Sequence, residues 1–227
     1  MKGTKWGILL SVLALAAPVG AQMGMDAFQR PALMKVFHPV VGKGARYAST
    51  SKTGGQAWTE ELSIVGKDTV DGKDAYWMEM VRIDDKSGEH GGKALITVDD
   101  FQVHRMVMEV PGQGLMEMPA NMLMTSAKAG QHIQENMKEW HSVGSDTITV
   151  PAGTFSCEHW RNDKKNEDMW ASDKVVPFGM VKQAGPTSEM VLVKTLDSVQ
   201  DRYSGPAKTF DMQQMMQQMQ QRQQQHP

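Results

Sequence analysis

Apolar and polar residues alternate with a period of two over most of the chain between Ala45 and Asp201. Short alternating segments bounded by Gly, Pro, Asp and Ser are typical of strands joined by hairpins. The pattern predicts ten strands, over residues 46–53, 57–65, 74–84, 93–98, 101–110, 139–150, 153–162, 168–173, 178–183 and 188–201. The connections are short and no strand alternates regularly with a helix, which favours antiparallel pairing.

Three segments have a helical pattern instead. Residues 26–36 start with Asp26 as an N-cap, and residues 119–128 hold a cluster of Ala, Met and Leu. In the Gln-rich C-terminal segment, four methionines repeat at helical offsets and share one face: Met212, Met215, Met216 and Met219. We therefore predict a mainly β fold of the α+β class. It consists of a large curved antiparallel sheet or half-barrel of about ten strands, one or two short helices and a C-terminal helical tail.

Several strands are apolar on both faces. In the strand over 74–84, Ala75, Trp77 and Val81 lie on one face, whereas Tyr76 and Met78 lie on the other. A sheet with one face in water carries apolar residues at one parity only. The second face must therefore be covered by a helix, by the curl of the sheet or by a ligand. A curved sheet around an apolar space satisfies this requirement.

The first 21 residues have the layout of a secretory signal peptide. Lys2 and Lys5 precede an apolar run over 8–17, which is about half the length of a bilayer-spanning helix. Pro18 ends the run, and small residues lead to an expected cleavage after Ala21. No cysteine follows this site to carry a lipid anchor, and no later stretch is long and apolar enough to span a membrane. We expect a periplasmic or secreted protein.

These features divide the chain into four parts. Residues 1–21 form the signal peptide, 22–44 an N-terminal segment with a short helix, 45–203 the antiparallel β domain, and 204–227 a Gln/Met-rich tail. Without the signal peptide, 22 basic residues remain against 26 acidic ones, a formal charge of −4. This balance excludes nonspecific binding to nucleic acid, which needs clustered Lys and Arg. A single cysteine excludes an intrachain disulfide and a multi-cysteine zinc site.

Two motifs carry a resemblance to a known family. One is the Thr149–Cys157 segment, which reads VPAGTF-x-C from Val150. The other is the Met169–Lys182 segment, which contains W-x-S-D, V-P-F-G and M-V-K. Both segments resemble exported bacterial β-proteins of the LolA/LolB type. By element order the resemblance covers residues 45–203. It implies a strongly curved antiparallel half-barrel, and the better-known relatives carry lipid or acyl chains in its concavity.

Methionine is the first candidate for function, since the chain has 20 of them. Met-x-Met pairs on a strand place both thioethers on one face. We predict an apolar ligand site lined by Tyr76, Met78, Met80, Met106 and Met108. The alternative is a copper site, because soft thioether ligands select Cu(I). Its ligands would be His104, Met106, Met108, Cys157 and His159.

Catalysis has little support in the sequence. Cys157 and His159 are two residues apart on a predicted strand and share a face, but no third group or oxyanion motif accompanies them. The Walker, Rossmann and G-x-S-x-G patterns are absent. We therefore predict a non-enzymatic exported protein, without a cofactor, that binds a lipid or acyl chain. The two alternatives are a periplasmic copper-binding protein and an envelope interaction or structural protein whose C-terminal tail binds a protein partner.

Overall fold

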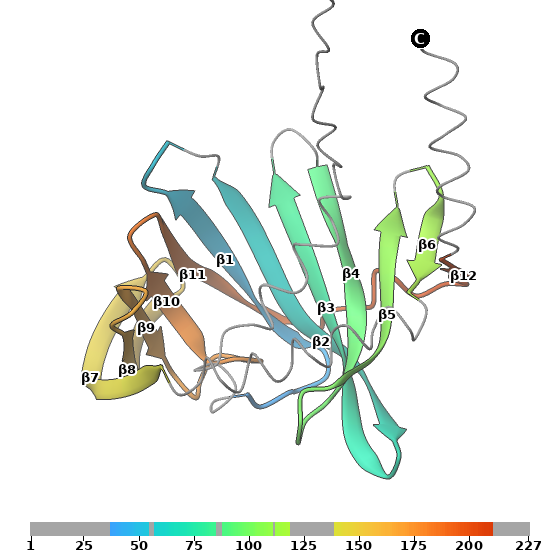
Figure 1. Cartoon of the computed structure of the whole chain (residues 1–227), viewed down its shortest axis with the longest axis horizontal. Helices are drawn as coiled ribbons and strands as arrows, with labels where there is room; N and C mark the ends of the chain where they lie inside the picture. Colours follow the sequence, from blue (N-terminus) through green and yellow to red (C-terminus); the bar gives the residue numbers. More distant parts are fainter. Residues whose placement is uncertain (1–36, 55–56, 85–87, 111, 119–138, 211–227) are drawn as a thin grey trace, which may run out of the picture.

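The computed structural model describes residues 37–54, 57–84, 88–110, 112–118 and 139–210. All regular structure within these ranges is β, and it forms one twelve-stranded sheet (Figure 1). The strands are β1 (Lys43–Ser51), β2 (Trp58–Val70), β3 (Lys73–Asp84), β4 (Gly88–Thr97), β5 (Val103–Val110), β6 (Gly114–Glu117), β7 (Trp140–Val150), β8 (Gly153–Asn162), β9 (Glu167–Ala171), β10 (Met180–Ala184), β11 (Ser188–Asp197) and β12 (Lys208–Thr209).

The sheet is open, with the strand order β12-β6-β5-β4-β3-β2-β1-β11-β10-β9-β8-β7. Every neighbouring pair is antiparallel except β12 and β6, which are parallel. The chain therefore builds two meanders, β1–β6 and β7–β11, and β11 returns to pair with β1. At one end, the β7–β8 hairpin comes back against β11, where the Ala152 amide donates to the Leu192 carbonyl at 3.4 Å. In Figure 1 this end curls beside the longer strands β1–β5.

The predicted α+β class was wrong for the described residues, which form an all-β fold. Two further strands were missed because β6 has four residues and β12 two, too few for a visible alternation. The helices expected over 26–36, 119–128 and the C-terminal tail lie outside the described residues.

The inner face of the sheet, defined by Tyr47, Leu62, Ile64, Met78 and Ile96, carries the core. All five side chains are at most 1% exposed. The register explains their meeting, because Leu62 lies opposite Met80 and Ile64 opposite Met78, so the apolar parities of adjacent strands coincide. Burial of such side chains stabilises the fold by about 1.5–3 kcal/mol each.

Phe37 seals one end of this core. Its ring lies 5.0 Å from that of Phe101, edge to face, and 4.9 Å from that of Phe178. The His38 amide next to it donates to the Pro177 carbonyl at 3.0 Å. The chain before β1 is thereby fixed to the loop between β9 and β10.

The outer face carries Glu61, Glu79 and Val81. Residues 198–206, which we call the strap, lie over it. The Arg202 guanidinium donates to Glu61 at 2.6 Å, and its backbone amide donates to Glu79 at 2.9 Å. Tyr203 packs so closely over β4 that a Cβ on Gly91 would lie 2.6 Å from its hydroxyl oxygen. The strap therefore covers the part of the second face that β2, β3 and β4 form, where the two-sided strands required a cover.

Candidate functional site

The inner face carries a cluster of methionines, which we call the methionine face: Met78, Met80, Met106, Met108 and Met116. In one cross-strand row, Met80 lies opposite Gly92, Gly92 opposite Met108, and Met108 opposite Met116. In the next row, Met78 lies opposite Ala94, and Ala94 opposite Met106. Met78 is fully buried and Met116 is 8% exposed, whereas the other three are partly buried. Flexible thioethers thus form an adaptable apolar surface across four strands.

Tyr76, the fifth residue expected to line a ligand, belongs to the same surface. It lies opposite Ile96 and packs against the core that contains Met78. The five predicted lining residues therefore share one face. Met116 was missed, although Met116-x-Met118 has the same spacing as the other methionine pairs, because the four-residue strand β6 was not recognised.

The residues of the predicted copper site are distributed differently. The register shifts between Leu95 and Ile96, so Leu95 pairs with Arg105 and Ile96 with Val103. His104 is the extra residue of this bulge, and its Nε2 lies 3.2 Å from Thr97 Oγ1. Val103 therefore takes the core position in line with Met106 that an unbroken strand would have given to His104.

Cys157 and His159 lie on β8, on the other side of β11 from the methionine face. Among the described residues, no group of three or more His, Cys, Asp or Glu side chains is arranged to hold a metal ion. The structure thus brings together Met106 and Met108 of the proposed copper ligands, but not the full set.

His159 is held in a charged network. Its Nε2 lies 2.8 Å from Asp168 Oδ1 and its Nδ1 3.2 Å from Asp146 Oδ2. Its ring stacks on Trp170 with centroids 4.5 Å apart, and the Trp170 indole N–H donates to Asp146 at 2.9 Å. Arg161 adds a 2.8 Å ion pair to Asp168. Two carboxylates around one imidazole orient the ring, and this network links β7, β8 and β9.

Cys157 is buried beside this network and is 2% exposed. Burial, aided by the charge of Asp146, raises the pKa of the thiol to about 11. A nucleophilic cysteine needs the opposite shift, because the thiolate is the reactive form. The arrangement of Cys157 and His159 is therefore that of a structural cysteine next to a histidine whose ring is held between two carboxylates.

We expect Cys157 to react with iodoacetamide at pH 7.5 at least about 100-fold more slowly than a free thiol, because burial and a high pKa both suppress the thiolate. Urea should restore the ordinary rate by unfolding the sheet. Mass spectrometry of the alkylated protein over time measures both rates. Rapid labelling of the folded protein would contradict the structural role.

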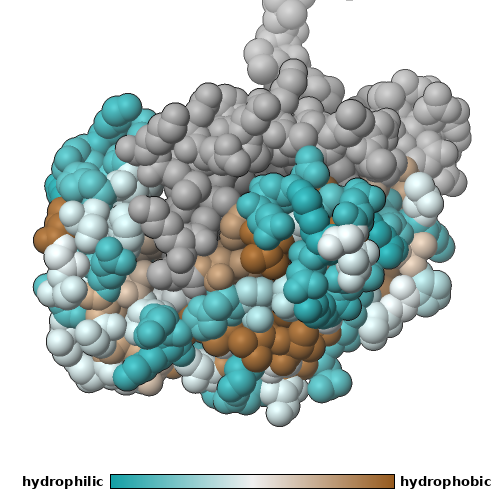
Figure 2. All heavy atoms as spheres, turned by 90° about the horizontal axis from the view of Figure 1, so that it is seen from below, coloured by the Kyte–Doolittle hydropathy of each residue, from teal (hydrophilic) through white to brown (hydrophobic). Residues whose placement is uncertain are grey.

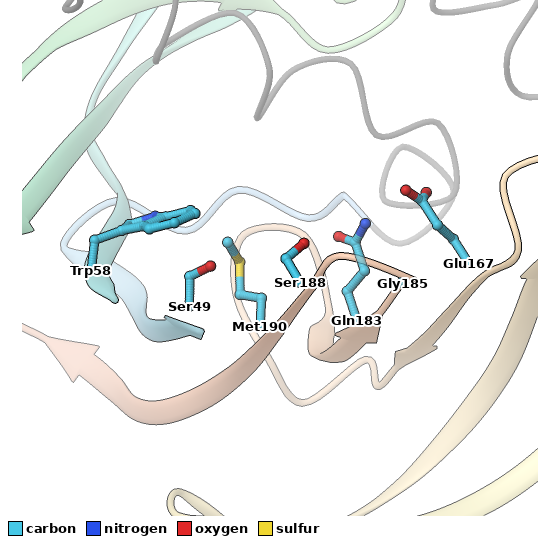
Figure 3. Close-up of a pocket in the computed structure, with 7 residues that line it drawn as sticks. All are labelled: Ser49, Trp58, Glu167, Gln183, Gly185, Ser188 and Met190. Atoms are coloured by element: carbon cyan, nitrogen blue, oxygen red, sulfur yellow. The ribbon is translucent and has the colours of Figure 1, made fainter. Parts of the chain in front are cut away.

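A small pocket lies at the end of the inner face, lined by residues of β1, β2, β9, β10 and β11 (Figure 3). Its volume is about 60 Å³, enough for one or two water-sized groups. In Figure 3, Trp58 stands at one end and Glu167 at the other, with the remaining side chains between them. The lining residues are Ser49, Trp58, Glu167, Gln183, Gly185, Ser188 and Met190. The side-chain oxygen of Gln183 is buried without a hydrogen-bond partner in the described part of the chain.

Trp58 connects this pocket to a cationic rim. The guanidinium carbon of Arg82 lies 4.3 Å from the centre of the Trp58 ring. Arg82 has the same parity on β3 as Met78 and Met80, two residues beyond Met80, so it borders the methionine face. Sequence reasoning did not single out Arg82 or Trp58. The sequence signal that could have identified Arg82 is the alternation along the strand, which continues from Met78 and Met80 to this charged residue.

Some apolar residues lie on the outside of the molecule. Figure 2, a view from below, shows apolar residues gathered near the middle of the surface and hydrophilic ones around them. Val40, Val41 and Val143 are the exposed large hydrophobic residues of the described ranges, at 40–50% exposure. No helix within the part of the chain that the structure describes is long and apolar enough to cross a membrane.

Comparison with known proteins places no family on this chain. No family model matches the sequence, and no curated protein matches it. Similar solved structures exist at low identity. A protein described as a lipoprotein from Parabacteroides distasonis is 14% identical, with 70% of this chain and 97% of that chain covered and a TM-score of 0.37. An exported protein with a YmcC-like fold from Bacteroides fragilis is 12% identical, with 70% and 98% covered and a TM-score of 0.37.

The complex of MucA and MucB from Pseudomonas aeruginosa gives a third match. The identity is 7%, the alignment covers 79% of this chain and 58% of that chain, and the TM-score is 0.40. This chain therefore spans less than two thirds of the matched protein. All three similarities are too distant to carry an argument about function. The resemblance to the LolA/LolB group stays a prediction.

Proposed function

We propose that the protein is an exported, non-enzymatic binding protein that holds a lipid or acyl chain against the methionine face. The observation that carries the proposal is the register that aligns Met80, Met108 and Met116 in one row beside Met78 and Met106. Linear acyl chains have no polar group to orient them, and thioethers adapt to such ligands at low cost. The partial exposure of Met80, Met106 and Met108 leaves part of this surface accessible for contact.

Export rests on the N-terminal signal-peptide pattern over residues 1–21. The description of one structural neighbour as an exported protein is in line with it. A non-enzymatic role is supported by the high pKa of Cys157 and by the two carboxylates, Asp146 and Asp168, that contact both ring nitrogens of His159. Among the described residues, Cys157 and His159 do not form the arrangement of oriented nucleophile, base and oxyanion donors that acyl transfer needs.

The copper alternative and the partner alternative have less support. The bulge on β5 separates His104 from the methionines, and the residues of the C-terminal tail lie outside the described ranges. MucB is a protein found in complex with MucA, but at a TM-score of 0.40 this similarity does not extend to a partner for the present chain.

Native mass spectrometry of the mature protein, purified from a lipid-rich host, tests the proposal. We expect co-purified lipid with the wild-type protein and with Met80→Leu, which keeps the apolar surface. Met80→Asp should lose the lipid, because an ionised carboxylate on an apolar face disfavours an acyl chain by several kcal/mol, roughly a hundredfold or more in affinity.

The Leu variant is the matched control, since it removes the thioether while keeping the volume and the apolar character. Bound copper that disappears in Met106→Leu would instead support the metal alternative. Met108→Asp provides a second test nearer the edge of the sheet if Met80→Asp fails to fold. Lipid-free wild-type protein with no binding of added acyl chains would contradict the proposal.

A further inference from the structure

Arg82 lies at the rim of the methionine face, in an environment that favours an anionic partner. Arg82 is stacked on Trp58 at 4.3 Å, and its Nε is buried with no hydrogen-bond acceptor among the described residues. A buried N–H of a charged group without an acceptor destabilises the folded state, so such groups are rare in folded proteins.

The residues opposite Arg82 on the neighbouring strands do not accept a hydrogen bond from its Nε. Glu60 on β2 lies directly opposite Arg82, and His90 on β4 lies opposite it on the other side. Nevertheless, the Nε of Arg82 has no acceptor among the described residues, and the guanidinium lies over the indole ring of Trp58. The planar face of Arg82 is thus used by Trp58, and the Nε–H at its edge remains for an acceptor.

The position of this cation relates it to the apolar surface. Arg82 follows Met80 by one step of the alternation, a rise of about 7 Å along the strand. Trp58, on the far side, also lines the small pocket next to Ser49 and Met190. An elongated ligand lying on the methionines would therefore end at the Arg82–Trp58 pair.

From this arrangement we infer that the ligand is an amphiphile with an anionic headgroup, which accepts hydrogen bonds from Arg82 while its acyl chain lies on the methionine face. This inference rests on the proposed function and adds the chemical class of the headgroup. Carboxylates and phosphates both match the fork of N–H donors of a guanidinium, and the Trp58 ring fixes the plane of that fork.

Titration calorimetry on the mature protein with three probes of equal chain length tests the inference. Palmitate carries a carboxylate, lysophosphatidylglycerol with a palmitoyl chain carries a phosphate, and monopalmitoylglycerol is neutral. We expect at least one anionic probe to bind about 10- to 100-fold more tightly than the neutral one, the value of a charge-assisted hydrogen bond. The preferred anionic probe distinguishes a fatty-acid ligand from a phospholipid ligand.

Substitutions test whether Arg82 causes the preference for an anionic probe. Arg82→Gln should remove the preference for the anionic probe and leave the affinity for the neutral probe within about twofold, while Arg82→Lys should keep part of it. Arg105→Gln is the matched control. Arg105 also stacks on a tryptophan, at 5.2 Å from the Trp77 ring, but it lies on the outer face and pairs with Glu117. Its substitution should leave all three affinities unchanged.

The outcomes separate the two proposals. Equal affinity for the neutral and the anionic probes would overturn the anionic headgroup and leave the lipid-binding function standing. A preference for anionic probes that survives Arg82→Gln would overturn the role of Arg82. Failure of all three probes to bind would overturn the proposed function itself. The comparison of probes on the wild-type protein needs no variant, so it holds even if Arg82→Gln fails to fold.

Discussion

Replacement of Arg202 by alanine is expected to destabilise the protein by about 2–4 kcal/mol at pH 7.5. Arg202 is the cation of the strap that faces two buried acids, and the side chains of Glu61 and Glu79 are 3% and 1% exposed. Breaking a fully buried ion pair costs about 3–5 kcal/mol. We expect a smaller cost of about 2–4 kcal/mol, because the Arg202 side chain is itself 36% exposed and water can partly replace it. Urea unfolding of the two proteins measures the difference.

The effect should be smaller in acid. Burial is the main cause that raises the pKa of Glu79 above its ordinary 4.5, against the lowering effect of Arg202. An acid whose folded pKa is raised stabilises the fold most below its ordinary pKa, and this contribution is lost as the pH rises through the folded value. Removal of Arg202 raises the pKa of Glu79 further. The difference between variant and wild type should therefore shrink as the pH falls from 7.5 toward 4.5.

A double substitution isolates the cause. Glu79→Gln in the Arg202→Ala background should recover part of the lost stability, since the uncompensated charge is gone. Glu61 keeps a second cation, because Arg46 Nε donates to it at 2.6 Å, and it should contribute less to the recovery. If Arg202→Ala cost less than about 0.5 kcal/mol, in the range of ordinary surface substitutions, the strap would not be a stabilising element.

Replacement of Tyr47 by alanine is expected to cost about 3–5 kcal/mol, the range for loss of a large buried aromatic side chain. Tyr47 is 0% exposed and lies at the middle of the sheet, between Leu192 on β11 and Glu60 on β2. It bridges the two meanders, because β1 and β11 are the only direct strand pairing between them in the described sheet. Thermal and urea unfolding should show one cooperative transition at lower stability.

Two variants accompany this measurement. Tyr47→Phe keeps the ring and should lose much less, whereas Thr50→Ala changes an exposed residue of the same strand and should stay within about 0.5 kcal/mol. A Tyr47→Ala protein as stable as Thr50→Ala would mean that the junction of the meanders does not depend on this side chain.

The alternation of residues was sufficient for the strands that are long and bounded by turn residues. The strand expected over 153–162 is observed with these bounds as β8. The turn between β2 and β3 was also predictable, because Asp71 and Gly72 have positive φ of 50° and 78°, which Asp and Gly adopt more readily than other residues. The short strands β6 and β12 were not predicted, since four or two residues are too few to show a period.

Parity along a strand is a local property, and the register of β3, β4 and β5 decided that Met106 and Met108 share the face of Met78 and Met80. The sequence itself placed Tyr76, Met78 and Met80 together, and Met106 and Met108 together. It failed at His104 for a physical reason. A bulge changes the parity of one strand relative to the other, and only the paired strand reveals it. The Arg82–Trp58 pair was equally invisible, since the two residues lie 24 positions apart and meet only through the β2–β3 pairing.

The sequence by itself thus determined the antiparallel strands, their two-sided apolar character and the shared side of the two methionines in each Met-x-Met pair. All of these follow from local alternation and turn chemistry. The tertiary structure decided what covers the second face over β2, β3 and β4, which is the strap with its contacts to Glu61 and Glu79. It also decided that Arg82 lies at the end of the methionine face with a buried N–H. Such contacts join distant segments through burial and charge, which a one-dimensional pattern does not contain.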